Sequence, residues 1–162
     1  REMIIIQDVL EDCVRLLTEF GEIKRCEIHR FYRDGVPLIM ADKFELEHLF
    51  INLIMNASHA MKGAEENKLA IETYLNPDGD FVEISISDTG FGIPEENVKK
   101  IFTPFFTTKR GNDGSGLGLS IVKNIVDRHH GRIDVQSETG RGTTFRVSLP
   151  VNTETRNLER CK

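Results

Sequence analysis

Residues 42–63, with the sequence DKFELEHLFINLIMNASHAMKG, decide the fold of this chain. Apolar residues recur here at helical spacing, Asp42 is a typical N-cap and Gly63 a typical C-terminal stop, so the pattern predicts a long helix over 42–61. Apolar side chains surround most of that helix, which is typical of a buried helix. The exception is a polar stripe at positions i, i+4, i+8 and i+11, made of His48, Asn52, Asn56 and His59.

The polar stripe has two interpretations. The asparagines can be satisfied core residues and the histidines surface residues, because buried polar groups normally find partners. Alternatively, Asn56 offers a neutral carbonyl oxygen to a hard cation such as Mg²⁺, with waters and phosphate oxygens completing the coordination.

The segments on both sides of this helix indicate an α/β (α+β) two-layer sandwich. Upstream, the pattern predicts a helix over 6–19 and a hairpin of strands 26–33 and 36–40 that turns at Asp34-Gly35. Downstream, it predicts strands 69–75 and 81–87, a helix over 119–128, and a hairpin of strands 133–137 and 144–149. This order predicts a mixed, mostly antiparallel sheet packed against helices on one face.

Residues 88–118 form a long irregular segment, with one predicted helical turn at 98–101, and such a segment is typical of a functional loop. It opens with DTGFGI at 88–93. Asp88 follows a strand, where its carboxylate can accept a hydrogen bond from an exocyclic amine, and Gly90 and Gly92 let the backbone approach a flat ring. A plain Asp-Thr-Gly turn is the alternative interpretation.

The same segment ends with GSGLGLS at 114–120, directly before a predicted helix. Glycines there expose N–H groups to a phosphate. A dinucleotide fingerprint requires glycine where Leu119 stands, and a Walker A loop requires lysine where Leu117 stands. An ordinary glycine-capped loop is the alternative. Upstream, the phenylalanines of FTPFFTTK at 102–109 either pin the loop to the core or leave Lys109 free to reach a phosphate.

Composition limits the classes of partner. The chain has 162 residues and a net charge of −5, which argues against nucleic acid or an anionic membrane as the main partner. Three cysteines without CxxC spacing favour a reduced, intracellular chain without a zinc site. No apolar run is long enough to span a bilayer.

Taken together and in order, the motifs NLIMNA, DTGFGI, FTPFFTTK, GSGLGLS and GRGTTFRVSLP resemble the catalytic ATP-binding domain of sensor histidine kinases, part of the gyrase, chaperone and histidine-kinase superfamily. The FTPFFTTK motif is similar to that of the nitrogen-regulation type. The resemblance covers residues 6–150 and implies a Bergerat-type sandwich with an ATP lid. We therefore expect one catalytic domain at 1–151 and a polar tail at 152–162.

The resemblance also implies roles for individual residues. Asn56 is expected to bind Mg²⁺, Asn52 lies one turn before it, and Glu47 on the same helix is a candidate base for a histidine nucleophile. Asp88 is expected to bind the adenine amine. The implied ATP-binding set is Asn56, His59, Asp88, Gly90, Gly92, Ile93, Phe105, Lys109, Gly114, Gly116, Leu117, Gly118, Leu119 and Thr143.

The family transfers the γ-phosphoryl group of ATP to a histidine, usually one followed by an acidic residue. None of the five histidines here has an acidic residue after it. We therefore expect the acceptor on a separate dimerisation domain of a homodimeric parent chain in the cytoplasm, with a response regulator downstream. The alternatives are a gyrase- or chaperone-type ATPase, which places glutamate where Asn52 stands, an anti-sigma-type serine kinase, and a non-catalytic nucleotide-binding module.

Overall fold

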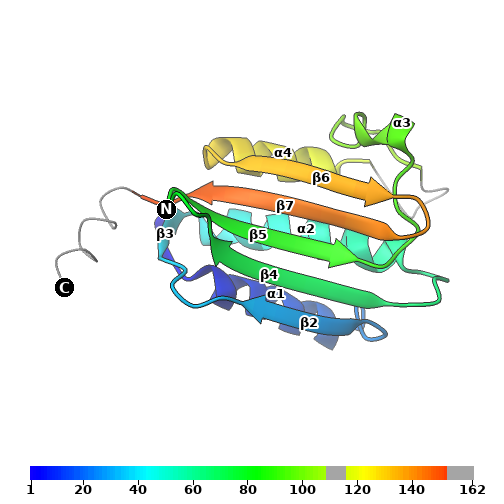
Figure 1. The fold of residues 1–162 in the computed structure, drawn as a ribbon, viewed down its shortest axis with the longest axis horizontal. Helices are drawn as coiled ribbons and strands as arrows, with labels where there is room; N and C mark the ends of the chain where they lie inside the picture. The colour runs from blue at the N-terminus through cyan, green and yellow to red at the C-terminus, as the bar shows by residue number, and fades with distance from the viewer. Residues whose placement is uncertain (109–115, 153–162) are drawn as a thin grey trace.

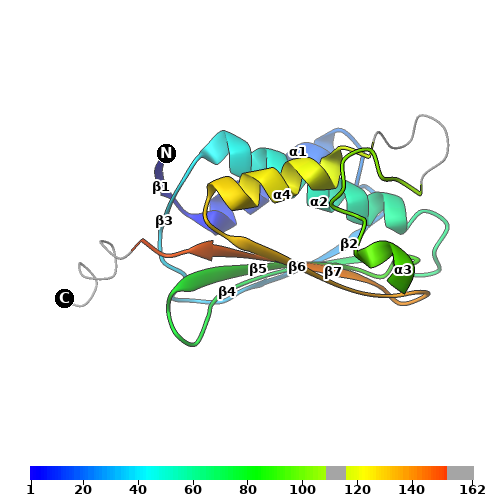
Figure 2. The same cartoon turned by 90° about the horizontal axis from the view of Figure 1, so that it is seen from above.

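The computed structural model describes residues 1–108 and 116–152, which form a five-stranded sheet with helices on one face (Figures 1 and 2). The strand order is β2-β4-β5-β7-β6. β2 pairs with β4 in parallel and all other neighbours are antiparallel. The strands are β2 (Glu27–Tyr32), β4 (Lys68–Leu75), β5 (Phe81–Asp88), β6 (Arg132–Glu138) and β7 (Gly142–Pro150). The predicted two-layer sandwich is confirmed.

Three helices, α1 (Ile6–Glu19), α2 (Lys43–Ala60) and α4 (Gly118–Arg128), cover the same face of the sheet (Figure 2). Their positions confirm the predicted helices. α2 begins as expected, because the Asp42 carboxylate accepts a hydrogen bond from the backbone N–H of Glu45 at 3.0 Å. It packs between α1 and α4 and buries Leu46, Leu49, Phe50, Leu53, Ile54 and Ala57. In the described part of the chain, no helix is long and apolar enough to cross a membrane.

The two predicted downstream hairpins are confirmed. β4 and β5 are joined by a turn in which the side-chain oxygen of Asn76 accepts hydrogen bonds from the N–H groups of Asp80 and Phe81, at 2.8 and 3.0 Å. β6 and β7 pair from Glu138 and Gly142 inwards. The second hairpin brings Thr143 opposite Asp88 on β5.

The predicted upstream hairpin is wrong. β2 continues along β4, because the N–H of Arg33 donates to the carbonyl of Thr73 at 3.0 Å. The returning segment instead forms β3 (Ile39–Ala41), which pairs antiparallel with β1 (Glu2–Ile4) in a separate two-stranded sheet. Asp34-Gly35 does turn the chain, but a turn does not determine which strands pair on either side of it.

The predicted helical turn at 98–101 is also displaced. The short helix α3 (Glu95–Val98) begins after Pro94, whose carbonyl accepts the N–H groups of Asn97 and Val98 at 2.8 and 3.2 Å. α3 contacts β6 and lies at the end of the sheet, away from the stack of long helices (Figure 1). The prediction overlooked that proline favours the first positions of a helix.

Candidate functional site

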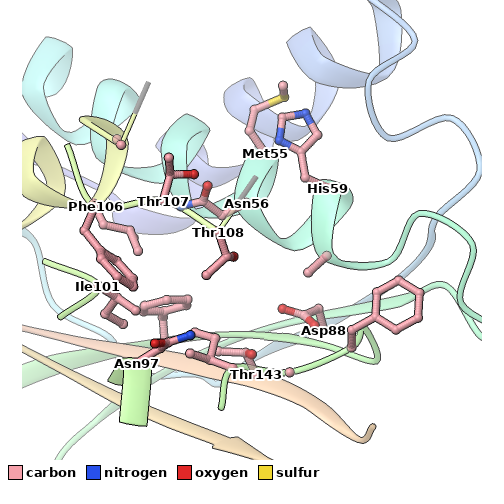
Figure 3. Close-up of a pocket in the computed structure, with 18 of the residues that line it drawn as sticks. Met55, Asn56, His59, Asp88, Asn97, Ile101, Phe106, Thr107, Thr108 and Thr143 are labelled. Carbon is pink, nitrogen blue, oxygen red and sulfur yellow. The ribbon is translucent and has the colours of Figure 1, made fainter. Parts of the chain in front are cut away.

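A cavity of about 530 Å³ opens between α2 and the sheet (Figure 3). It collects segments that are far apart in sequence: α2, the end of β5, α3, residues 101–108, the start of α4, and β7. Many of the predicted site residues line it, namely Asn52, Asn56, His59, Asp88, Gly92, Ile93, Gly116, Gly118, Leu119 and Thr143. The cavity therefore brings together residues from all five of the motifs that the sequence singled out.

Asp88 provides a buried carboxylate in the cavity wall. Asp88 is 8% exposed, and one of its carboxylate oxygens accepts the N–H of Gly90 at 2.8 Å. Burial raises the pKa of Asp88 to about 6, although hydrogen bonds from the backbone of Gly90 and Thr143 act in the opposite direction. A carboxylate in this position costs stability when ionised, and such groups concentrate at functional sites.

Thr143 lies beside Asp88 in the sheet, and its hydroxyl is already engaged by protein. The Thr143 and Ser137 hydroxyls share a hydrogen bond of 2.8 Å. Ser137 in turn accepts the N–H of Ile93 at 2.7 Å. This chain of contacts fixes the segment after Asp88 against the β6–β7 hairpin.

The glycines around Asp88 are needed for close backbone packing. A Cβ at Gly90 would overlap the carbonyl of Ala60 at the end of α2, and one at Gly92 would overlap the carbonyl of Glu138. Gly92 also has a φ of +74°, which side-chain-bearing residues rarely adopt. Gly90 itself does not line the cavity. The structure shows Gly90 packed against the end of α2, whereas the motif predicts a contact with the ring.

Asn52, Asn56 and His59 of the polar stripe of α2 line the cavity, whereas His48 is exposed outside it. Figure 3 shows the His59 ring beside Met55 on α2, with Asp88 and Thr143 across the cavity on the sheet. The Asn52 amide N–H donates to the carbonyl of His48 at 2.8 Å. A Cβ at Gly118 would come within 2.9 Å of the Asn52 side-chain oxygen. The start of α4 thus lies against α2 at Asn52.

The metal-binding potential of the cavity rests on neutral oxygen donors. Among the residues that the structure describes, no group of three or more His, Cys, Asp or Glu side chains could hold a metal ion. The Asn56 carbonyl oxygen suits Mg²⁺, which usually keeps several waters and takes few protein ligands beside phosphate oxygens. The residues present therefore fit a metal that enters together with a phosphate ligand.

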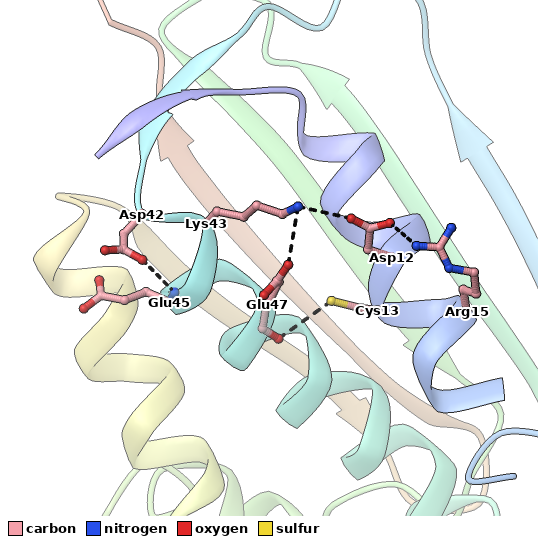
Figure 4. Close-up of polar contacts among 7 residues, drawn as sticks. All are labelled: Asp12, Cys13, Arg15, Asp42, Lys43, Glu45 and Glu47. Carbon is pink, nitrogen blue, oxygen red and sulfur yellow. Dashed lines mark hydrogen bonds and ion pairs between the residues drawn. The ribbon is translucent and has the colours of Figure 1, made fainter. Parts of the chain in front are cut away.

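Glu47 is not brought to the cavity. Its carboxylate lies 3.7 Å from the Lys43 ammonium, and its backbone carbonyl accepts a hydrogen bond from the Cys13 thiol at 3.8 Å (Figure 4). Glu47 therefore faces α1. The reason is helix geometry: Glu47 and Asn56 are separated by about 2.5 turns, which places them on opposite faces of α2.

Phe105 and Leu117 also lie outside the lining. Phe105 is 75% exposed with a φ of +67°, and its N–H donates to the carbonyl of Gly116 at 2.9 Å. Phe106 lines the cavity in its place. The Leu117 carbonyl accepts the Ser120 hydroxyl at 2.8 Å, and Leu117 is the residue that directly precedes α4. Lys109 and Gly114 lie outside the described residues.

Several lining residues were not predicted: Met55, Phe91, Asn97, Ile101, Phe106, Thr107, Thr108 and Phe145. Phe106 belongs to the FTPFFTTK motif, whose phenylalanines could also have pinned the loop to the core, and Met55 adjoins Asn56 in sequence. Asn97 carried no signal, because it lies on the turn whose position was predicted wrongly.

Comparison with known proteins identifies the family to which this fold belongs. Residues 41–153 match the family described as "Histidine kinase-, DNA gyrase B-, and HSP90-like ATPase". Sensor histidine kinase ZraS of Escherichia coli (strain K12) is 35% identical over 147 residues, which is 91% of this chain and 30% of ZraS. The chain thus spans less than a third of the length of that relative.

Solved structures of histidine kinases share the fold. The catalytic domain of histidine kinase ThkA matches with a TM-score of 0.76 at 32% identity, over 92% of this chain and 96% of that chain. Full-length ShkA in complex with AMPPNP matches with a TM-score of 0.78 at 28% identity, over 92% of this chain and 30% of that chain.

Proposed function

This chain belongs to the family of histidine kinase-, DNA gyrase B- and HSP90-like ATPases, and on that premise we propose that it binds ATP with Mg²⁺ and transfers the γ-phosphoryl group to a histidine on a separate phosphoacceptor domain. The relatives in sequence and in structure are sensor histidine kinases and their catalytic domains, which supports a role in two-component signal transduction.

The observation that carries the proposal is the Asp88 carboxylate. It is buried in the wall of a cavity large enough for a nucleotide, and the lining of the same cavity includes the apolar side chains of Ile93, Ile101 and Phe145. An ionised carboxylate can only accept hydrogen bonds, so it selects a ring that carries an amine. Adenine presents such an amine on a flat ring that fits between apolar side chains.

The opposite part of the cavity suits the phosphates. α4 begins there, no described residue caps it with a side chain, and the first N–H groups and the positive end of the dipole of a helix favour an anion. Asn56, with Asn52 and His59 on either side of it along the helix, faces the same space. Mg²⁺ would be held by the Asn56 oxygen and by phosphate oxygens, where it neutralises negative charge on the phosphates.

Transfer to an external acceptor is favoured over rapid ATP hydrolysis by what lines the cavity. Of the described lining residues, Asp88 alone is acidic. Its proposed partner is the amine of adenine, so it is not a candidate for activating water. The residue one turn before Asn56 is Asn52, and an amide cannot take a proton from water. Because Glu47 faces α1, the proposal assigns no catalytic base to it. We infer that the proton acceptor comes with the phosphoacceptor domain.

The remaining partners follow from the same proposal. The acceptor histidine lies on a dimerisation domain of a longer homodimeric parent chain, which passes the phosphoryl group to a response regulator in the cytoplasm. The greater length of ZraS supports such a parent chain, because this chain corresponds to 30% of it.

Calorimetric titration with ATP and Mg²⁺ tests the nucleotide site. Asp88→Ala should weaken ATP binding about 10- to 100-fold, because a hydrogen bond to a charged group contributes about 1.5–3 kcal/mol. The gap between ATP and GTP should shrink in the same variant. Asp134→Ala is the matched control, since Asp134 is an exposed aspartate on β6 outside the cavity. Unchanged ATP binding in Asp88→Ala would overturn the site assignment.

A further inference from the structure

We propose that Asn97 is a second nucleoside-recognising residue of this cavity, whose carboxamide donates a hydrogen bond to a ring nitrogen of the purine on an edge that Asp88 does not hold. The inference rests on the ATP binding proposed above and deepens it. It concerns how the base is selected and oriented, and it adds a residue that the sequence motifs did not indicate.

The backbone around Asn97 is fully engaged, so the position of this residue is fixed. Its N–H donates to the Pro94 carbonyl and its carbonyl accepts the N–H of Lys100, both at 2.8 Å. The preceding Ile93 is anchored to β6, because its N–H donates to the Ser137 hydroxyl at 2.7 Å. α3 is therefore held against the end of the sheet, and the backbone that carries the Asn97 side chain at the cavity is fixed in position.

The side chain of Asn97, in contrast, has hydrogen-bonding capacity to spare. It is half-buried and lines the cavity. Within residues 1–108 and 116–152, its carboxamide makes no hydrogen bond to protein. The nearby Asp88 and Thr143 side chains do have protein partners, Gly90 and Ser137. A carboxamide has two donor hydrogens and an acceptor oxygen, and leaving them unmatched after desolvation costs free energy.

Buried apolar residues line the cavity together with Asn97. Ile101 and Phe145 are 6% and 5% exposed, and the Phe145 ring packs edge-on against Phe102 with 6.4 Å between centroids. A base entering this part of the cavity would displace water from the carboxamide. A hydrogen bond formed in such surroundings is stronger than one in water, so a mismatched base would be rejected more firmly.

The chemistry of Asn97 complements that of Asp88. In Figure 3, Thr143 is drawn between Asp88 and Asn97 along the sheet side of the cavity, so the two side chains approach a bound ring from different sides. The ionised Asp88 can accept the exocyclic amine but cannot bond to a ring nitrogen, which is itself an acceptor. The Asn97 amide can donate to one. Together they would match one donor and one acceptor of adenine.

The test is a calorimetric titration of the whole chain with ATP and Mg²⁺, and with ATP analogues in which one ring nitrogen at a time is replaced by a CH group (1-deaza, 3-deaza and 7-deaza). The variants are Asn97→Leu, which keeps the volume and removes the hydrogen bond, and Asn97→Ser, which covers failure of the leucine variant to fold. Glu96→Gln is the control, because Glu96 is the exposed neighbour on the same helix.

Asn97→Leu and Asn97→Ser should each weaken ATP binding about 3- to 10-fold, the value of one net hydrogen bond. One deaza analogue should bind the wild type more weakly than ATP does. Asn97→Leu should bind that analogue and ATP equally tightly, because the variant has already lost the hydrogen bond that the analogue removes. Glu96→Gln should bind like the wild type.

Wild-type affinity in the Asn97 variants would overturn the inference, as would a full deaza penalty for every analogue in Asn97→Leu. These outcomes are distinct from failure of the proposed function. Suppose that the wild type and the Asn97 variants bind ATP equally well and Asp88→Ala does not bind it. That result would refute the role of Asn97 and leave the proposed ATP binding intact. If the wild type does not bind ATP, both proposals fall.

Discussion

Replacing Asp88 with asparagine should make the ligand-free domain more stable while weakening its affinity for ATP. Burial raises the pKa of Asp88 from 3.8 to about 6 in the folded state. At about 1.4 kcal/mol per pKa unit, this rise corresponds to about 3 kcal/mol of destabilisation when the carboxylate is ionised. Asparagine has nearly the same shape and carries no charge, so it escapes this penalty.

The pH dependence has a definite sign. The pKa is higher in the folded state than in the unfolded state, so folding favours the protonated carboxyl, and stability is lost as pH rises from about 4 through about 6. The stability gain of Asp88→Asn should therefore reach its maximum, up to about 3 kcal/mol, near pH 8. By the same relation it should fall to about half that value at pH 5.

Urea unfolding of the wild type and of Asp88→Asn at pH 5 and pH 8 measures this difference, and Asp134→Asn serves as the exposed control. Calorimetry on the same samples should show weaker ATP binding by Asp88→Asn at pH 8. The reasoning is refuted if Asp88→Asn is less stable than the wild type at pH 8, or if the stability difference does not change with pH.

Three further outcomes are expected. Asn56→Ala should weaken ATP binding about tenfold in Mg²⁺ but leave binding in EDTA nearly unchanged; equal losses in both titrations would assign Asn56 to the core. ATP affinity of the wild type should fall up to tenfold per pH unit below about 6, because Asp88 must ionise to accept the amine; a flat profile between pH 5 and 8 would contradict this. Gly92→Ala should destabilise the domain by roughly 3 kcal/mol, measured by urea unfolding, since its Cβ would overlap the Glu138 carbonyl at a φ of +74°. Gly140→Ala, at a φ of +83° with open space around it, should lose only about 1–2 kcal/mol.

The long helices were predictable because their signals are local. The Asp42 cap of α2 and the apolar periodicity of α1 lie within each segment, and neither depends on distant parts of the chain. The pairing of β2 and β3 was not predictable in this way. A strand pattern with a turn at Gly35 fits a hairpin equally well, and the actual partners, β4 and β1, are selected by packing across the whole domain.

The site residues also differ in whether the local sequence was enough to predict them. Asp88, Asn56, Gly92, Gly116 and Gly118 were predicted from motifs because their chemistry is visible in residue type, and all five line the cavity. Phe105 was predicted to line the site, but Phe106 lines it instead. The backbone at Phe105 is left-handed and its ring is exposed, and the sequence gives no sign of that conformation. Glu47 is a different case, since its separation from Asn56 by 2.5 helical turns was already readable from the sequence.

The most direct test of the central claim is to incubate the chain with γ-labelled ATP and Mg²⁺, with and without a dimerisation domain that carries an exposed histidine. We expect no labelling of the chain alone and little release of phosphate, because no described acid in the cavity is placed to activate water. With the domain present, an acid-labile phosphohistidine should form on that domain. Rapid phosphate release by the chain alone would indicate an ATPase, and an acid-stable phosphoserine on the partner would indicate a serine kinase; either result would contradict the account.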